Sequence, residues 1–207
     1  MDQRLFFPAT ERNRDHIGEV LSKVLPQSGL VLEIASGSGE HGVAFQKRFP
    51  NLCWQTSDPA LSSRESIRAW INYQGLGNKM PEPIDLDAEK RPWLLTAESQ
   101  SSLQAIVCIN MIHISPWSCT EALFEEAGNL LKKDQLLMLY GPFKRYGDHI
   151  SESNSRFDKS LKVQNPSWGV RDLDAVSEIG MNNGLEKYKV VDMPANNLSI
   201  IFLKKKS

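Results

Sequence analysis

Residues 30–42 read LVLEIASGSGEHG, and this stretch decides the fold. Residues 30–34 form an apolar run with a single acid, which is typical of a buried strand. The turn that follows contains Gly37, Gly39 and Gly42, and a helical pattern continues after it. A strand, a glycine-rich turn and a helix together predict a ligand site at the N-terminus of that helix.

Outward from this stretch, apolar runs and helical stripes alternate along the chain. Apolar residues with helical spacing between residues 17 and 25 predict a helix ahead of the first strand. The expected strands are residues 30–34, 52–57, 84–86, 104–109, 135–140, 185–193 and 198–203, and further helices are expected near 62–74, 123–131 and 172–182. Five parallel strands closed by an antiparallel C-terminal hairpin, with helices on both faces, make a seven-stranded, doubly wound α/β fold.

The 207 residues contain no repeat, low-complexity tract or Pro/Gly-rich linker, so a single domain over residues 1–207 is expected. Residues 1–29 form an N-terminal arm and helix. Residues 143–170 show no clear period and follow the carboxyl end of the fifth strand, where ligands bind in open α/β sheets. We predict that they form a substrate lid; a surface excursion with a small helix of its own is the alternative.

Charge and composition exclude several classes of function. The 24 Lys and Arg against 25 Asp and Glu leave a net charge of −1, whereas phosphate-driven nucleic-acid binding needs a surplus of cations. The most apolar stretch, residues 106–114, is far shorter than the roughly 18 residues of a membrane span. The first residues lack the order of a secretion signal. The three cysteines and four histidines are scattered and predict no metal site. A cytoplasmic protein without nucleic-acid or membrane partners is expected.

Residues 37–42, GSGEHG, match the GxGxxG pattern of dinucleotide sites, so an NAD-dependent oxidoreductase must be considered. Glu33, at the carboxyl end of the predicted strand, argues against it, because a carboxylate there repels a pyrophosphate. The ammonium and sulfonium groups of S-adenosylmethionine are attracted to a carboxylate, and nearby backbone N–H groups can bind the carboxylate of this cofactor. Glu33 therefore favours S-adenosylmethionine.

Residues 30–39, LVLEIASGSG, resemble the first motif of class I S-adenosylmethionine-dependent methyltransferases, with Ala35 in place of the first of the usual three glycines. Five further strings resemble the methyltransferase-like family of domain of unknown function 938, related to animal methyltransferase-like 26: PATERNRDHI (8–17), NMIHISPW (110–117), YGPFKRYGDHISESNSRFD (140–158), NPSWGVRDLD (165–174) and MPANNLSIIF (193–202). The resemblance covers nearly the whole chain and implies a single-domain, Rossmann-like class I methyltransferase fold. It implies cofactor contacts from Glu33, Ala35, Gly37 and Gly39, but no established substrate.

Acidic residues after two further strands complete the expected cofactor site. Asp58 follows the second strand, where an acid accepts hydrogen bonds from both ribose hydroxyls. The methyltransferase pattern also expects an acid beside the adenine amino group after the third strand, and Asp87 is chosen over Asp85 for this role. Because the two carboxylates are two residues apart, one of them can instead cap a helix or lie in a solvated turn.

The resemblance places residues that touch the methionine end of the cofactor and the acceptor after the fourth strand. Asn110 and Met111 are expected to contact the cofactor. His113 can take a proton from the acceptor near neutral pH, and Tyr140, at the end of the fifth strand, can orient the acceptor. Both have a structural alternative, in which the His113 ring packs under the next helix and Tyr140 packs in the core.

Five residues are expected to contact the acceptor, because they combine hydrogen-bond donors with aromatic rings: Arg12, Asn13, Tyr146, Asn154 and Trp168. Arg12 and Asn13 belong to a polar run that a member of the family would fold over the cofactor pocket. Arg12 is otherwise a solvated cation. The other three lie in the predicted lid.

These observations predict a methyltransferase that transfers a methyl group in line to a small molecule. Alignment supplies much of the rate of such a displacement, and a strong base is optional. The neutral charge disfavours an RNA substrate, and a lid of mixed polarity suits a small acceptor. The alternatives are a catalytically silent module that binds S-adenosylmethionine and a protein or RNA methyltransferase, with an NAD-dependent oxidoreductase less favoured.

Overall fold

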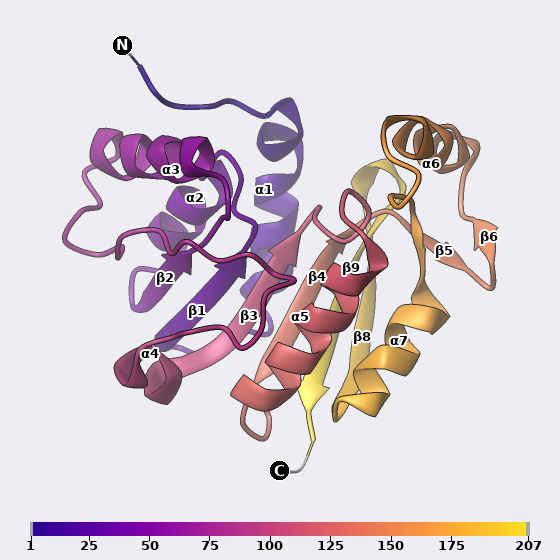
Figure 1. The fold of residues 1–207 in the computed structure, drawn as a ribbon. Coiled ribbons are helices and arrows are strands. Elements are labelled where there is room, and N and C mark those ends of the chain that lie inside the picture. The colour runs from indigo at the N-terminus through magenta and orange to yellow at the C-terminus, as the bar shows by residue number, and fades with distance from the viewer. Residues whose placement is uncertain (1, 206–207) are drawn as a thin grey trace. The chain divides into compact units, whose positions relative to one another are not determined.

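The structure, a computed structural model, describes residues 2–205 and divides into two compact units. The first unit runs to Cys108, and the second begins at Ile109. Each combines strands with helices (Figure 1). The single domain expected from the sequence stays a prediction.

A three-stranded parallel sheet forms the centre of the first unit. β1 (Gly29–Ile34) pairs with β2 (Leu52–Thr56) along one edge and with β3 (Leu103–Ile109) along the other. The helices are α1 (Pro8–Leu21), α2 (Glu40–Arg48), α3 (Leu61–Tyr73) and α4 (Ala97–Ser102). Residues 30–34 are buried without a break, as expected of a parallel strand covered on both faces. The turns that follow β1 and β2 therefore lie at the same edge of this sheet.

Helix α1 begins earlier and ends earlier than the apolar stripe predicted. Pro8 occupies its first turn, where a fixed φ and a missing N–H carry no penalty. The helix ends at Leu21, and Leu25 follows in a turn closed by its N–H on the Leu21 carbonyl. Pro26 disfavours the helical conformation at Leu25, which explains why the apolar pattern outlasts the helix.

The strand predicted over residues 84–86 is absent. Ile84 makes only an isolated parallel bridge with Ser57. The Ile84 N–H donates to the Thr56 carbonyl, and the Ile84 carbonyl accepts a hydrogen bond from Asp58 N. On the same side of the segment, the Glu82 carbonyl accepts a hydrogen bond of 2.7 Å from the Gln55 side chain instead of from the β2 backbone. The backbone of the segment therefore pairs with the sheet at one residue and continues as an irregular chain.

The second unit contains an antiparallel sheet in the order β4-β9-β8. Its elements are α5 (Trp117–Leu130), β4 (Leu136–Gly141), α7 (Leu173–Asn182), β8 (Leu185–Met193) and β9 (Asn197–Lys204), and a 3₁₀ turn, Pro194–Asn196, closes the β8-β9 hairpin. Phe124 of α5 and Phe202 of β9 meet edge to face with ring centres 5.0 Å apart. Only the two end residues of β8, Leu185 and Met193, are buried, as suits an edge strand.

Of the strands expected from the sequence, residues 2–205 thus contain six, β2-β1-β3 in the first unit and β4-β9-β8 in the second. The α/β class, the parallel strands and the antiparallel C-terminal hairpin are confirmed. The predicted number of seven strands is wrong, because residues 84–86 do not form one.

The segment after β4 has regular structure that its sequence did not reveal. β5 (Phe143–Arg145) pairs with β6 (Asp148–His149) and with β7 (Arg171–Asp172), and α6 (Glu152–Gln164) lies between β6 and β7 in the chain. The Ser151 hydroxyl accepts a hydrogen bond from Asn154 N and caps α6. The alternative of an excursion with its own helix describes this architecture, whereas closure as a lid stays a prediction.

Candidate functional site

The glycine-rich turn joins β1 to α2 with three residues in the left-handed region. Ala35, Gly37 and Gly39 have φ values of 55°, 56° and 88°. Glycine adopts such angles without steric penalty, whereas another residue pays roughly 1–2 kcal/mol. Ala35 therefore takes up a glycine-like backbone at the position where the sequence departs from the three-glycine pattern.

Gly39 is also needed for the close approach of α3. A Cβ atom on Gly39 would lie 2.8 Å from Cγ1 and 2.9 Å from Cα of Ile67. Gly39 directly precedes α2, whose first N–H groups have no partner within the helix. The turn therefore leaves the N-terminus of α2 beside a backbone that carries no side chain.

Glu33 is 1% exposed and lies one residue before the end of β1. Its Oε2 accepts a hydrogen bond of 2.8 Å from the indole Nε1 of Trp54, and a Cβ on Gly42 would lie 3.0 Å from the same atom. Burial raises the pKa of Glu33 to about 7, against the opposing effect of hydrogen bonds from Trp54 and Ser36. The carboxyl group thus lies between β2 and α2 and titrates near neutral pH.

A second buried carboxyl group belongs to Glu40, the first residue of α2. Its Oε2 accepts hydrogen bonds from Ser38 Oγ at 2.8 Å and from Phe7 N at 2.7 Å. A Cβ on Gly37 would lie 3.1 Å from the Phe7 ring. The arm that precedes α1 is therefore held against the glycine-rich turn through a carboxyl group at the start of α2.

A third buried carboxyl group belongs to Asp58, just beyond β2. Its Oδ2 accepts a hydrogen bond from Gly37 N and its Oδ1 one from Ala60 N, each at 2.9 Å. A carboxylate oxygen has two lone pairs, so each can accept a further hydrogen bond. Asp58 thus ties the turn to the end of β2 and keeps the capacity to bind hydroxyl groups.

Asp87 and Asp85 follow the bridge at Ile84 and have different partners. The Asp87 carboxylate accepts a hydrogen bond from Glu89 N at 3.1 Å and lies 3.4 Å from Lys90 Nζ. The Asp85 carboxylate pairs with Arg64 at 2.8 Å. The two-residue spacing therefore places one acid in a local turn and the other in an ion pair with α3.

Both aspartates line a pocket of about 220 Å³ in the first unit. Leu86 and Trp93, which are buried, contribute apolar surface to the same pocket. An apolar pocket edged by carboxylates has the chemistry that an adenine ring with its amino group requires.

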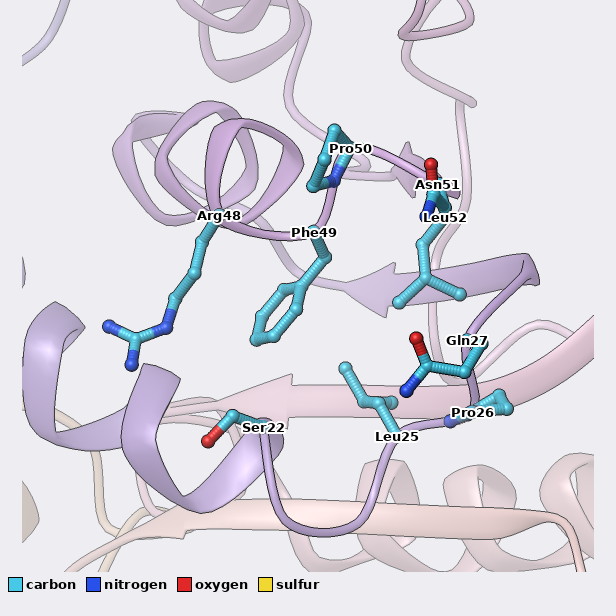
Figure 2. A pocket seen from close by; sticks show the side chains of 9 residues that line it. All are labelled: Ser22, Leu25, Pro26, Gln27, Arg48, Phe49, Pro50, Asn51 and Leu52. Atoms are coloured by element: carbon cyan, nitrogen blue, oxygen red, sulfur yellow. The ribbon is translucent and has the colours of Figure 1, made fainter.

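A second pocket, of about 150 Å³, lies away from these carboxyl groups (Figure 2). It is lined by the chain after α1 and by the connection from α2 to β2, including Leu25, Arg48, Phe49 and Leu52. Figure 2 shows Leu25, Phe49 and Leu52 around a common space. These residues precede or begin β1 and β2, whereas the glycine-rich turn and Asp58 follow them, so this pocket opens at the opposite edge of the strands.

Helix α1 carries two of the residues expected to contact the acceptor. Asn13 is buried, and its Oδ1 accepts a hydrogen bond of 2.7 Å from His41 Nε2, because an amide oxygen cannot donate. Burial, with a contribution from Arg14, lowers the pKa of His41 to about 3, so the ring is neutral at pH 7. Arg12 is exposed. This exposure agrees with both interpretations of Arg12, a contact to the acceptor and a solvated cation.

In the second unit, the chain after β3 carries Asn110, Met111 and His113 in a tight loop ahead of α5. Asn110 has a φ of 57°, which asparagine tolerates better than most residues, and its N–H donates to the Tyr140 carbonyl at 2.8 Å. The buried Met111 accepts a hydrogen bond from Ile114 N at 2.9 Å. We refer to residues 110–115 as the His113 loop.

The His113 side chain is 3% exposed and touches Phe157 of α6 edge to face, with ring centres 5.7 Å apart. Across residues 2–205, its Nδ1 finds no hydrogen-bond partner. A Cβ on Gly141 would lie 3.0 Å from His113 Cε1, so the missing side chain makes room for the ring. Burial and the charge of Arg171 lower the pKa of His113 to about 4, which leaves a neutral imidazole at pH 7.

The remaining predicted residues of the second unit differ in exposure. Tyr140 is buried on β4, Tyr146 is 87% exposed and Trp168 is half-buried. Asn154 is buried, and its Nδ2 donates to the Asn196 carbonyl at 2.9 Å. Asn154 therefore has a structural contact that holds α6 to the β8-β9 hairpin.

Three residues with contacts to the predicted site were not among the site residues expected from the sequence. Glu40 is recognisable only as an acid at the start of a helix. Asp158 could have been found from its helical spacing to Lys162, with which it pairs at 2.8 Å. Arg171 has no local signal, because it donates to Ile112, 59 residues earlier.

Within the range 2–205, no helix combines the length and the apolar character that crossing a membrane requires. In the same range, no three His, Cys, Asp or Glu side chains gather as metal ligands. Within the same residues, Cys53, Cys108 and Cys119 take part in no disulfide.

Comparison with known proteins gives a family and a fold. A family model described as a protein of unknown function (DUF938) matches residues 4–204. An O-methyltransferase family protein from Burkholderia thailandensis is 15% identical with a TM-score of 0.78, over 96% of this chain and 58% of that one. Human N-acetylserotonin methyltransferase, solved with S-adenosylmethionine, is 12% identical with a TM-score of 0.76, over 96% and 53%.

An O-methyltransferase from neocarzinostatin biosynthesis, solved with S-adenosylmethionine and 2-hydroxy-5-methyl naphthoic acid, is 11% identical with a TM-score of 0.68, over 94% and 57% of the two chains. This chain thus spans somewhat more than half the length of the solved proteins. At these identities the likeness shows a common fold, and it confirms the Rossmann-like methyltransferase architecture expected from the sequence.

Proposed function

The chain belongs to the DUF938 family, and we propose that it is an S-adenosylmethionine-dependent methyltransferase that acts on a small molecule. The observation that carries this proposal is the cluster of three buried carboxyl groups around the glycine-rich turn, Glu33, Glu40 and Asp58. Within residues 2–205, the hydrogen bonds to these carboxyl groups come from indole, hydroxyl and backbone N–H donors, which are uncharged.

A cluster of this kind favours a cationic ligand over an anionic one. Two unit charges 4 Å apart interact by about 4 kcal/mol at the effective dielectric of a protein surface, so the sign of the ligand charge matters. The pyrophosphate of NAD would meet like charges at this turn. The start of α2, where a phosphate would bind, already holds the carboxyl group of Glu40.

In this proposal, different residues of the first unit bind different parts of the cofactor. Asp58 accepts hydrogen bonds from the ribose hydroxyls, and Asp87 accepts one from the adenine amino group. Leu86 and Trp93 pack against the adenine ring. Residues 35–39 let the cofactor approach the backbone. Glu33, whose pKa is about 7, contributes negative charge from beneath α2 once the cationic cofactor favours its ionised form.

Further residues are assigned to the methionine end of the cofactor and to the acceptor in this proposal. Asn110 and Met111 contact the cofactor there. S-adenosylmethionine, when bound, supplies a methyl group activated by its sulfonium. His113 is neutral at pH 7 and takes the proton that the acceptor releases, and Tyr140 orients the acceptor.

A small acceptor agrees with the solved proteins of similar fold, which include an N-acetylserotonin methyltransferase and an enzyme bound to a naphthoic acid. Contacts to the acceptor are assigned to Arg12, Asn13, Tyr146, Asn154 and Trp168. A silent binding module remains the main alternative, because cofactor binding alone does not require turnover.

Calorimetric titration with S-adenosylmethionine, S-adenosylhomocysteine and NAD tests the cofactor. We expect binding of the first two and none of NAD; binding of NAD alone would reject the proposal. Asp58→Asn should weaken S-adenosylmethionine binding about tenfold or more, because an amide offers fewer acceptor sites to two hydroxyl groups. Glu82→Gln, an exposed acid paired with Arg68, is the matched control and should leave the affinity unchanged.

Turnover separates the enzyme from the silent module. Incubation of the protein with methyl-tritiated S-adenosylmethionine and a metabolite extract should yield a labelled product of low mass. Label in protein or RNA would replace the small acceptor, and binding without any labelled product would favour the silent module.

A further inference from the structure

We propose that Arg171 is a positioning residue, which holds the His113 loop so that the imidazole stays in one place. This inference rests on the proposed role of His113 in methyl transfer. It concerns contacts inside the second unit and adds a residue to which the sequence analysis assigned no role.

The guanidinium group of Arg171 binds carbonyl groups on both sides of His113. Its Nε donates to the Ile112 carbonyl at 2.9 Å, and its Nη2 donates to the Ser115 carbonyl at 2.6 Å. The same Nη2 donates to the Ser167 carbonyl at 2.9 Å. A guanidinium group offers several donors in a rigid plane, so one side chain fixes three carbonyl groups relative to each other.

The backbone of the neighbouring segment completes this clamp. Gly169 N donates to the His113 carbonyl at 3.0 Å, so the carbonyl groups of residues 112, 113 and 115 are all bound from residues 169–171. A Cβ on Gly169 would lie 2.8 Å from Asp158 Oδ1, which also accepts a hydrogen bond of 2.7 Å from Val170 N. The carboxylate of α6 therefore anchors the segment from which Gly169 and Arg171 reach the loop.

Polar side chains around the Asp158 carboxylate compensate its negative charge. The buried Asp158 carboxylate lies 2.8 Å from Lys162, 3.2 Å from His149 and 3.7 Å from Lys144. These three side chains come from α6, β6 and β5. Burial lowers the pKa of Arg171, and the negative charge of Asp158 opposes this effect. The Arg171 guanidinium is thus attracted to Asp158 of α6, while its N–H groups donate to carbonyl groups of the His113 loop.

The ring itself has little freedom once its backbone is held. Phe157 contacts one side, and the absent side chain of Gly141 leaves just enough room at Cε1 and Nδ1, with a hypothetical Cβ 3.0 and 3.1 Å away. The nearby positive charge of Arg171 adds to burial in keeping the ring neutral. A clamp that fixes the loop therefore also protects the form of histidine that accepts a proton.

Arginine is suited to this position and lysine is not. A lysine has one ammonium group at the end of a flexible chain, and it cannot fix three carbonyl groups in a plane. Arg171→Lys thus keeps the charge and loses the geometry, whereas Arg171→Gln loses both. Arg156→Gln is the matched control, because Arg156 is a surface residue of α6 whose partner is the exposed Glu152.

The test measures the His113 pKa by NMR titration of ¹⁵N-histidine, with His113→Asn for assignment, and hydrogen exchange of the Gly169 amide. In Arg171→Gln we expect a His113 pKa at least about 0.5 units higher, since a positive charge is removed, and Gly169 exchange at least about tenfold faster. Arg171→Lys should show the faster exchange with a smaller change in pKa, and Arg156→Gln should match the wild type.

A folded Arg171→Gln protein with unchanged pKa and unchanged Gly169 exchange would overturn the proposal. If that variant does not fold, Arg171→Lys decides through the exchange of Gly169 alone. In the methyl-transfer assay we expect both Arg171 variants to lower kcat more than they raise KM, and Arg171→Gln to move the acid limb of kcat upward in pH. Absence of turnover in the wild type would reject the proposed function, while the NMR results would still decide on Arg171.

Discussion

The glycine-rich turn and the His113 loop both follow a strand, but they are held in different ways. The turn of residues 35–39 depends on backbone angles and on the space that Gly39 leaves for α3. The His113 loop depends on donors from residues 169–171, which lie more than fifty positions along the chain. The glycine-rich turn can therefore be recognised from a short stretch of sequence. The contacts that hold the His113 loop can be recognised only in the folded chain.

This difference predicts that the turn fails when one of its own residues changes, whereas the loop fails when a distant residue changes. The three substitutions below separate the two cases, in order of decreasing effect. They complement the tests of Asp58 and Arg171.

Gly39→Ala should destabilise the protein by about 3 kcal/mol, because the new Cβ meets the Ile67 backbone and φ is 88°. Urea unfolding measures the loss. Gly77→Ala is the matched control, since a Cβ there meets nothing within 4 Å, and it should change the stability by less than about 0.5 kcal/mol. Equal stability of the two variants would show that α3 does not need the close approach.

Glu33→Gln should change the pH dependence of stability by about 2 kcal/mol. The unfolded chain ionises Glu33 near its ordinary pKa of 4.5, whereas the folded protein keeps the proton up to about pH 7. The folded state therefore binds more protons in this window, and wild-type stability falls as the pH rises through it. Glutamine can still accept the indole hydrogen bond of Trp54 but has no proton to lose.

Unfolding measured from pH 4.5 to 8 tests this prediction. The Glu33→Gln protein should lose stability less steeply than the wild type, and the exposed Glu82→Gln should follow the wild type. Parallel curves for Glu33→Gln and the wild type would mean that Glu33 has an ordinary pKa in the folded protein.

Asp158→Asn should destabilise the second unit by about 1 kcal/mol at pH 7 and should speed hydrogen exchange in residues 167–171 but not in residues 35–39. Burial alone would raise the Asp158 pKa, but the hydrogen bonds from Lys162 and Val170 and the charge of Lys144 hold it below the ordinary value. The contribution of this carboxylate is therefore present at neutral pH and is lost as the pH falls through the folded pKa.

The exposed Asp192, which pairs with Arg145, supplies the matched control for Asp158. Asp192→Asn should leave the exchange of residues 167–171 at the wild-type rate. If Asp158→Asn behaves in the same way, the anchor does not depend on the carboxylate.

The sequence predicted most elements of both units, because their signals are local. Apolar runs located β1, β2, β3, β4, β8 and β9, and the helical stripe near residues 62–74 located α3. It failed at residues 84–86, where Leu86 and Ile84 looked like a short strand. Pro81 and Pro83 carried the opposing signal, since proline next to an apolar run disfavours a strand inside a sheet.

The sequence predicted the kind of site and some of its residues, but not the contacts between them. Asp58 and the turn were recognisable because a strand end and a glycine pattern lie close together in sequence. The indole partner of Glu33 was not, because Trp54 lies on another strand. Residues 152–164 are mostly polar, and their helix was missed because its apolar face is short and few of its residues are buried.

The sequence by itself determined an α/β chain with a glycine-rich turn, acids after its strands and a histidine in the loop before α5, because periodicity and glycine content act on neighbouring residues. Only the tertiary structure decided that three carboxyl groups are buried around the turn, that His113 is neutral and that Arg171 holds its loop. Burial, charge and hydrogen bonding of these groups depend on side chains that are distant in the chain and meet only when it folds.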